Sequence, residues 1–295
     1  MQDIAVLSAR KTTPGTIEQM VEFAHQANLQ QIDIMSDAPS TSHALQASCP
    51  HDWPWQQLRD EADKHQIDVN KLPAEGRRKK LMLADMDATI IRGESLDELA
   101  ELAGIAEQIK PITARAMAGE LDFNEALAAR LALLAGQPQT LLDDVINNTV
   151  ITDGGREAVA TMRAHGSSCY LVSGGFTFLT GVIAKTLGFN GHHSNIMDVA
   201  DGKLTGRAVP PILGKQAKLA FLQKYIADYG LRPDDTLCVG DGANDMAMLN
   251  HAGLGVAFEG KPALREQINI QLNHTDLTGL LYLQGYRQDE FVGGD

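Results

Sequence analysis

The chain has 295 residues, of which 44% are hydrophobic and 21% charged, so it is long enough for about two domains and has the composition of a folded protein. A formal net charge of −13 argues against nucleic acid as a partner, because it repels a polyphosphate backbone. Apolar runs fall short of the ~18 residues that a membrane span needs, and the N-terminus lacks the core of a signal peptide. Cys49, Cys169 and Cys238 lack CxxC spacing and suit buried packing in a reducing compartment, so we expect a cytoplasmic protein without a membrane partner.

Residues 1–76 predict a small α+β domain with the order β-α-β-(β)-α-β. Its expected elements are a strand over 3–7, a helix that begins at the T-x-x-Q capping box 16–19, strand residues 32–34, a helix over 55–65 and a closing strand over 67–72. Residues 73–80 combine Pro, Gly and four basic side chains, which predicts a solvated linker. We place the domain boundary after residue 76.

Residues 77–295 predict a second domain built on a doubly wound parallel sheet. Short apolar runs bounded by Gly, Asp or Ser predict buried parallel strands at 81–84, 169–172, 236–239 and 254–258. The first three runs end in polar clusters, and ligands bind at the carboxyl ends of such strands, so we expect the active site there.

Two further features belong to this second domain. Residues 92–150 have a helical pattern with a capping box at 95–98, and we expect them to form a cap over the site, which leaves 77–91 and 151–295 as the core. An Asp201-Gly202 turn predicts a hairpin between the strands 196–199 and 204–209. The cap is therefore expected to be all-helical, with the hairpin as a separate excursion.

Aspartates follow two of the predicted strands. Asp85 and Asp87 lie two residues apart, so one carboxylate can attack a phosphorus atom while the other gives a proton to the leaving oxygen and later takes one from water. Two carboxylates beside a dianionic phosphate require a cation, and Asp241 and Asp245 can complete an oxygen-ligand site for Mg²⁺. The alternative for either cluster alone is a tight turn with a helix N-cap.

Weaker signals point to an anion site. The Ser173-Gly174-Gly175 turn offers backbone N–H groups and a hydroxyl, and Lys218 can neutralise charge on phosphoryl oxygens. A plain turn and a surface lysine are the alternatives. His192-His193 has no further ligand at a suitable spacing, which disfavours a metal site there.

One charge in the predicted cap needs a partner. Arg130 shares a helix stripe with Leu127 and Leu134, away from the solvated face. Glu94 has the opposite sign. The two side chains either form a structural salt bridge or bind the two charged ends of an amino acid.

Taken together, the motifs resemble those of the haloacid dehalogenase superfamily of phosphohydrolases. The four ordered motifs are residues 83–89, residues 172–176, Lys218 and residues 239–245. Within that superfamily, residues 94–100, 117–123 and 201–206 are similar to segments of the phosphoserine phosphatase family. The resemblance runs from about residue 81 to near the C-terminus, and residues 1–76 resemble the family's ACT-like extension in element order only.

The resemblance implies magnesium-dependent hydrolysis of O-phosphoserine to serine and phosphate, the last step of serine biosynthesis, and it allows a homodimer. It implies Asp85 as nucleophile and Asp87 as general acid and base. Mg²⁺ would be held by the Asp85 side chain, the Asp87 carbonyl and Asp241, with Asp245 orienting a water ligand. The implied substrate contacts are Ser173, Gly174 and Lys218 to the phosphoryl group with Asn244 in support, Glu94 to the ammonium group, Arg130 to the carboxylate, and Met117 and Phe123 to close the cap.

One residue departs from the family pattern, since Ala88 stands where the family commonly has serine. Activity is expected with a lower rate, because Asp85 and Asp87 are intact. Two alternatives are a phosphatase or phosphomutase for another small metabolite and a catalytically silent protein that senses an amino acid. Glu94 and Arg130 argue against a sugar phosphate, and the intact aspartate pair argues against a silent protein.

Overall fold

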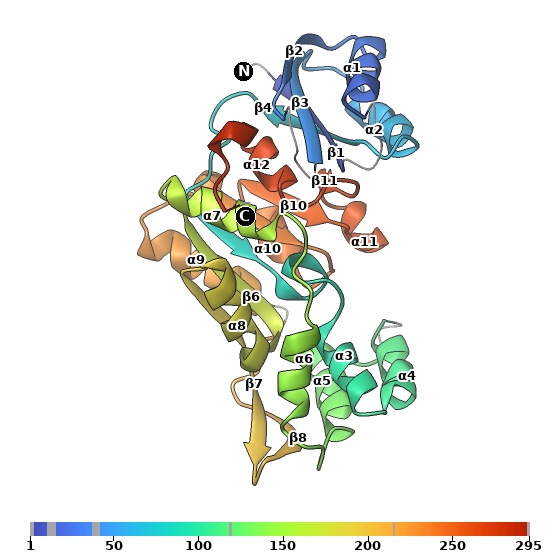
Figure 1. The fold of residues 1–295 in the computed structure, drawn as a ribbon, viewed down its shortest axis with the longest axis vertical. Helices are drawn as coiled ribbons and strands as arrows, with labels where there is room; N and C mark the ends of the chain where they lie inside the picture. The colour runs from blue at the N-terminus through green and yellow to red at the C-terminus, as the bar shows by residue number, and fades with distance from the viewer. Residues whose placement is uncertain (1–2, 11–15, 37–41, 118–119, 215, 294–295) are drawn as a thin grey trace.

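The N-terminal part of the chain folds into a four-stranded antiparallel sheet with the strand order β2-β3-β1-β4 (Figure 1). The computed structural model describes residues 3–10, 16–36, 42–117, 120–214 and 216–293. The elements are β1 (Asp3–Arg10), α1 (Thr16–Gln26), β2 (Gln30–Ile34), β3 (Ser42–Cys49), α2 (Trp55–Asp63) and β4 (Asp68–Pro73). This order confirms the predicted α+β unit.

Both faces of the N-terminal sheet are covered. Ala5, Leu7 and Ala9 alternate along β1 and pack in one cluster with side chains of α1 and α2. Ile4 and Val6 point to the opposite face and belong to the core cluster that includes α12 (Gly279–Leu283), near the C-terminus. The sheet is therefore packed between its own helices and the rest of the molecule.

Most residues of the connector between β4 and the next strand are exposed, as predicted, but several of its basic side chains contact other parts of the protein. The Arg77 guanidinium donates to Gln46 at 2.8 Å, and Arg78 donates to both carboxylate oxygens of Glu290 at 2.7 and 2.9 Å. Lys79 is buried, and its ammonium donates hydrogen bonds to the backbone carbonyls of Gly76 and Asp234. Apart from the Gly76 carbonyl, these acceptors come from distant parts of the chain, which the local run of basic residues does not reveal.

The larger sheet has seven strands in the order β11-β10-β9-β5-β6-β7-β8, and all neighbours are parallel except β7 and β8. Its strands are β5 (Leu81–Ala84), β6 (Ser168–Phe176), β7 (Gly191–Ala200), β8 (Lys203–Val209), β9 (Thr236–Gly240), β10 (Leu254–Phe258) and β11 (Ile270–Leu272). The four predicted core strands are confirmed. The three-residue edge strand β11 is too short to give a pattern of its own.

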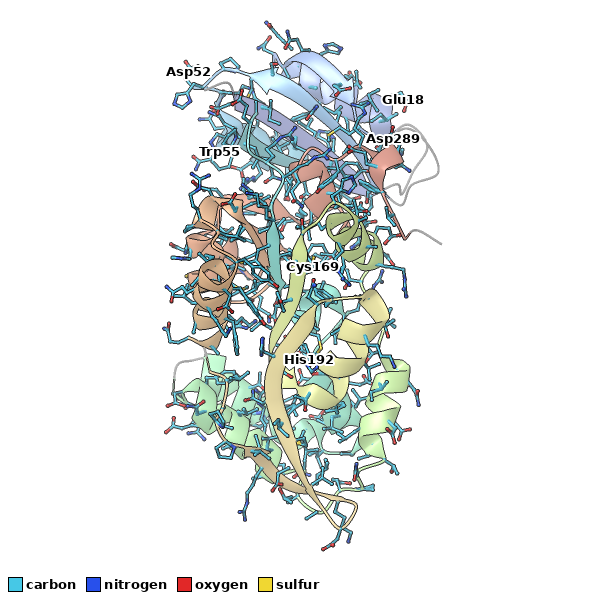
Figure 2. All side chains as sticks on the ribbon, turned by 90° about the vertical axis from the view of Figure 1, so that its left-hand side faces the viewer. Glu18, Asp52, Trp55, Cys169, His192 and Asp289 are labelled. Carbon is cyan, nitrogen blue, oxygen red and sulfur yellow. The ribbon has the colours of Figure 1, made fainter. Side chains whose placement is uncertain are left out.

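Helices cover both faces of this sheet, as the doubly wound prediction requires (Figure 2). One face carries α7 (Gly155–Ala164) and α8 (Thr177–Leu187), and the other carries α9 (Ala217–Asp228) and α10 (Met246–His251). Along β5, Leu81 and Leu83 pack in the cluster with α9 and α10, while Met82 and Ala84 pack in the opposite one. The central strand is thus apolar on both faces.

A helical insert lies beyond the carboxyl ends of these strands (Figure 1). Its helices are α3 (Ser95–Leu102), α4 (Ala106–Met117), α5 (Phe123–Ala132) and α6 (Leu141–Asn148). The chain leaves and returns through an antiparallel bridge between Ile91 and Ile151. The Asp201-Gly202 hairpin is confirmed, with φ values of 51° and 72° at its turn, and its strand β8 packs on α5.

The capping box predicted at 95–98 is wrong. Ser95 is the first residue of α3, and its backbone N–H donates to Asp87 instead of being capped locally. The capping box of this insert lies at the start of α5, where the side chains of Asp122 and Glu125 accept each other's backbone N–H at 2.8 and 2.9 Å.

One buried carboxylate joins the two sheets. Asp68, at the start of β4, accepts the backbone N–H groups of Asn273, His274 and Thr275 at 2.8, 3.0 and 2.9 Å. The hydroxyl of Thr275 adds a fourth hydrogen bond at 2.8 Å. Burial raises the pKa of Asp68, and these hydrogen bonds oppose that rise. Because three backbone donors and a hydroxyl converge on one buried carboxyl, this contact fixes the N-terminal sheet against the segment that follows β11.

Asp68→Asn should therefore destabilise the protein. An amide replaces one acceptor oxygen with a donor, so at least one buried backbone N–H loses its partner, at a cost of about 2–4 kcal/mol. The urea midpoint can be followed by tryptophan fluorescence, since both tryptophans, Trp53 and Trp55, lie in the N-terminal part. Asp63→Asn, an exposed carboxylate that pairs with His274, is the control and should change stability little. Equal midpoints for the two variants would contradict the role of Asp68.

Candidate active site

The carboxyl ends of β5, β6 and β9 meet the helical insert around a cavity of about 280 Å³. Eight residues predicted for the site line it, namely Asp85, Asp87, Glu94, Phe123, Arg130, Gly174, Asp241 and Asn244. Ser173 and Lys218 line an adjoining recess, and Asp245 is buried against Lys218. Met117 ends α4, but its side chain lies outside the described part of the structure, so its role stays a prediction.

Asp85 is held at the end of β5 by two contacts. One carboxylate oxygen accepts the backbone N–H of Met86 at 2.7 Å, and the other lies 2.7 Å from the Lys218 ammonium. The following turn, η1 (Met86–Ile90), bends through Ala88, which has φ of 51°. This left-handed conformation is uncommon for a residue with a Cβ, and the backbone N–H of Ala88 donates to the carbonyl of Gly93 at 2.8 Å.

Asp87 sits between the insert and the core. Its Oδ1 accepts the backbone N–H of Ser95 at 2.7 Å, and its Oδ2 accepts the hydroxyl of Ser173 at 3.2 Å. Burial raises the pKa of Asp87 to about 6, with the Ser95 hydrogen bonds opposing the shift and the Asp85 charge adding to it. Such a carboxyl can hold or release a proton near neutral pH.

Asp85, Asp241 and Asp245 form a buried acidic cluster, with one oxygen of each within 4.8 Å of the others. Burial raises the pKa of Asp241 and of Asp245, and the Asp85 charge raises both further. Lys218 contacts Asp245 and Asp85, and these two charges outweigh burial to raise the pKa of its ammonium. Three crowded carboxylates are a donor set that fits a hard divalent cation.

The last residues of β6 present backbone groups to the cavity. The Ser173 hydroxyl accepts the N–H of Gly175 at 2.8 Å, and the Gly174 carbonyl accepts from Asn195 at 2.8 Å. A Cβ built on Gly175 would lie 2.8 Å from Asp87 Oδ2. Glycine is therefore required for Asp87 to reach its position.

Glu94 and Arg130 face the same cavity but do not form an ion pair with each other in the described structure. The alternative prediction of a structural salt bridge between them is therefore wrong. Glu94 instead lies 3.1 Å from the ammonium of Lys261. The Nε of Arg130 is buried, and no hydrogen-bond acceptor lies within reach among the described residues. A buried guanidinium donor that lacks an acceptor indicates a place for an anionic ligand group.

Lys261 is a cavity residue that the sequence analysis missed. It follows the carboxyl end of β10, and its ammonium contacts both Glu94 and Asp241. The available signal was a basic residue shortly after another predicted strand. This signal was not enough to assign Lys261 to the site, because the sequence does not show that β10 lies next to β9 in the sheet.

The histidine pair has structural partners. A ring nitrogen of His192 is hydrogen-bonded to Thr180 at 2.9 Å, while His193 contacts the Tyr225 hydroxyl at 2.6 Å and stacks on Phe221. The metal interpretation is correspondingly disfavoured. Each cysteine is free and buried, as expected for packing residues.

Comparisons with known proteins agree with this geometry. The family model for haloacid dehalogenase-like hydrolases matches residues 82–250. The phosphoserine phosphatase SerB2 of Mycobacterium tuberculosis is 39% identical over 273 residues, which covers 91% of this chain and 67% of that protein. The phosphoserine phosphatase of Methanocaldococcus jannaschii is 38% identical over 205 residues, covering 70% and 97%.

Solved structures give the same result. A haloacid dehalogenase family hydrolase from Salmonella enterica serovar Typhi superposes with a TM-score of 0.84 at 27% identity, covering 95% of this chain and 98% of that one. A substrate-bound phosphoserine phosphatase gives a TM-score of 0.65 at 37% identity, covering 69% and 97%. The model match spans more than half of this chain, and the M. jannaschii relative is matched over nearly its whole length. The chain therefore belongs to the haloacid dehalogenase-like hydrolases and, among them, to the phosphoserine phosphatases.

Proposed function

We propose that this protein is a cytoplasmic, magnesium-dependent enzyme that hydrolyses O-phosphoserine to serine and phosphate, the last step of serine biosynthesis. The observation that carries the proposal is the unpaired, buried Nε of Arg130, which lines the same cavity as Asp85 and Glu94. A zwitterionic phosphomonoester brings one group for each, namely a carboxylate, a phosphoryl group and an ammonium.

Asp85 acts as the nucleophile. Its carboxylate oxygen attacks phosphorus while the bond from phosphorus to the serine oxygen breaks, which leaves an aspartyl phosphate. Asp87 gives its proton to the departing serine oxygen. The resulting Asp87 carboxylate then takes a proton from water as the water oxygen attacks phosphorus, releasing phosphate and restoring Asp85.

The raised pKa of Asp87 supports this assignment. A pKa of about 6 lies close to neutral pH, so the carboxyl can be protonated when it acts as an acid and ionised when it acts as a base. Its two hydrogen bonds hold it across the cavity edge from Asp85, between α3 and β6.

The acidic cluster is the proposed magnesium site, held by the Asp85 side chain, the Asp87 carbonyl and Asp241, with Asp245 supporting it. When bound, Mg²⁺ supplies positive charge that lets a dianionic phosphoryl group approach two carboxylates. Lys218 remains between Asp85 and Asp245 and neutralises charge on the phosphoryl oxygens. Ser173 and Gly174, supported by Asn244, bind the same oxygens from the adjoining recess.

Glu94 and Arg130 select the serine part. Arg130 binds the carboxylate, and Glu94 binds the ammonium group through an oxygen that Lys261 leaves free. Phe123 lies next to Gly174, because a Cβ built on Gly174 would be 3.3 Å from the Phe123 ring. Met117 and Phe123 are assigned to closing the cap.

A substrate panel tests the reaction. The protein should hydrolyse phosphoserine faster than phosphothreonine, a sugar phosphate and p-nitrophenyl phosphate, and EDTA should abolish the activity until Mg²⁺ is restored. Asp85→Asn should lose turnover by at least ~10³-fold, since an amide is a poor nucleophile of the same shape. A sugar phosphate as the best substrate would refute the proposal, and substantial turnover by Asp85→Asn would instead indicate direct attack by water.

Gly175→Ala should lower kcat for every substrate by about 10- to 100-fold. The new methyl group displaces Asp87 from its hydrogen bonds, and small misplacements of a reacting group are costly. The control is Gly181→Ala, where the nearest atom to the added Cβ, on His192, is 3.5 Å away. A normal kcat for Gly175→Ala would show that Asp87 has freedom to move.

Arg130→Ala should lower kcat/KM for phosphoserine by well over tenfold while p-nitrophenyl phosphate, which has no carboxylate, is little affected. Loss of a desolvated charged hydrogen bond costs about 2–5 kcal/mol. The two substrates serve as controls for one another. Equal losses for both, with a lowered melting temperature, would assign Arg130 to the structure of the insert instead of to recognition.

A further inference from the structure

Lys261 connects the insert to the core at the rim of the cavity. It precedes α11 (Pro262–Arg265), and its backbone N–H donates to the carbonyl of Asp241 at 2.8 Å. Its ammonium lies 3.0 Å from Asp241 Oδ2 and 3.1 Å from Glu94 Oε1. Asp241 directly follows the core strand β9, whereas Glu94 precedes the first helix of the insert, so the Lys261 side chain spans the two parts.

We propose that Lys261 is a positioning residue that determines specificity, because it holds Glu94 beside the metal site in the orientation that receives the substrate ammonium. This inference rests on the proposed function, in which Asp241 binds the cation and Glu94 binds the ammonium group.

The distribution of oxygens supports this role. Lys261 takes one oxygen of Asp241 and one of Glu94, which leaves the second oxygen of each carboxylate for another cation. Without the ammonium, two carboxylates would face each other across the cavity rim. The Glu94 side chain is 46% exposed, so repulsion would turn it toward solvent and away from the substrate.

Ion pairs at the surface usually contribute little, and the exposure of Lys261 alone would suggest the same here. The difference is Asp241, whose side chain is only 6% exposed and contacts the Lys261 ammonium, while its backbone carbonyl accepts the backbone N–H of Lys261. The Lys261 ammonium is therefore held in place by a buried residue of the core, and its contact with Glu94 restricts the position of the Glu94 carboxylate.

The same charge has an opposite effect on the cation. An ammonium beside Asp241 reduces the negative potential at the acidic cluster, so it weakens the binding of a divalent ion. Removing the ammonium should therefore strengthen the binding of Mg²⁺ and weaken the binding of phosphoserine. A residue with a purely structural role would weaken both, so the two signs distinguish the hypotheses.

The test is Lys261→Met, which removes the charge and keeps the length of the side chain and the backbone hydrogen bond to Asp241. Calorimetric titration with Mg²⁺ alone should show about three- to tenfold tighter binding. At saturating Mg²⁺, KM for phosphoserine should rise about tenfold with kcat changed less than about threefold. The KM for p-nitrophenyl phosphate, which has no ammonium group, should stay unchanged.

Two further variants control the experiment. Lys261→Arg keeps a charged donor and should restore KM for phosphoserine to within about threefold of the wild type. Lys224→Met removes a lysine of closely matched exposure, 57% against 54%, which pairs with Asp228 outside the cavity, and it should leave all three constants unchanged.

Weaker Mg²⁺ binding by Lys261→Met, an unchanged KM for phosphoserine, or equal rises in KM for both substrates would overturn the proposal. Lack of rescue by Lys261→Arg would overturn the role of the charge. A wild-type enzyme that does not hydrolyse phosphoserine would instead refute the proposed function, and the Mg²⁺ titration of Lys261→Met would still decide whether the ammonium acts on the acidic cluster.

Discussion

The crowding of negative charge at one edge of the sheet is the constraint on which the rest of this site depends. Four aspartates and Glu94 surround a single cavity or lie directly beneath it. Such a cluster is stable only with cations among the carboxylates, because several buried charges of one sign cannot all remain ionised together. Lys218 and Lys261 supply two permanent positive charges, and the remaining imbalance is what makes the cluster suited to a metal ion and a charged substrate.

Parallel topology explains why these charges can be brought together at all. Asp85 and Asp241 follow β5 and β9, Ser173 lies near the carboxyl end of β6, and neighbouring parallel strands end at the same edge. The insert contributes the residues that the strands cannot, because it arises between β5 and β6 and returns through the bridge at Ile91. In the proposed function, the core thus supplies the chemistry and the insert recognises the substrate.

The sequence predicted the core strands and their terminal carboxylates because fully buried strands leave apolar runs with sharp polar ends. It did not predict Lys261, whose importance depends on β10 lying beside β9. It also placed a local cap at Ser95, whose backbone N–H is taken by Asp87 from outside the helix. In both cases the deciding partner is remote in sequence, and no local pattern encodes it.

The packing of the N-terminal sheet has a consequence for any attempt to divide this protein. Ile4 and Val6 share a core cluster with Leu280 and Tyr282 of α12, all of them buried. A shortened chain that began after the connector would present Leu280 and Tyr282 to water, together with unpaired backbone groups at 273–275. The face of β1 that carries Ile4 and Val6 therefore forms part of the wall of the larger sheet's domain, and we expect a soluble truncated form to require replacement of the apolar surface left behind.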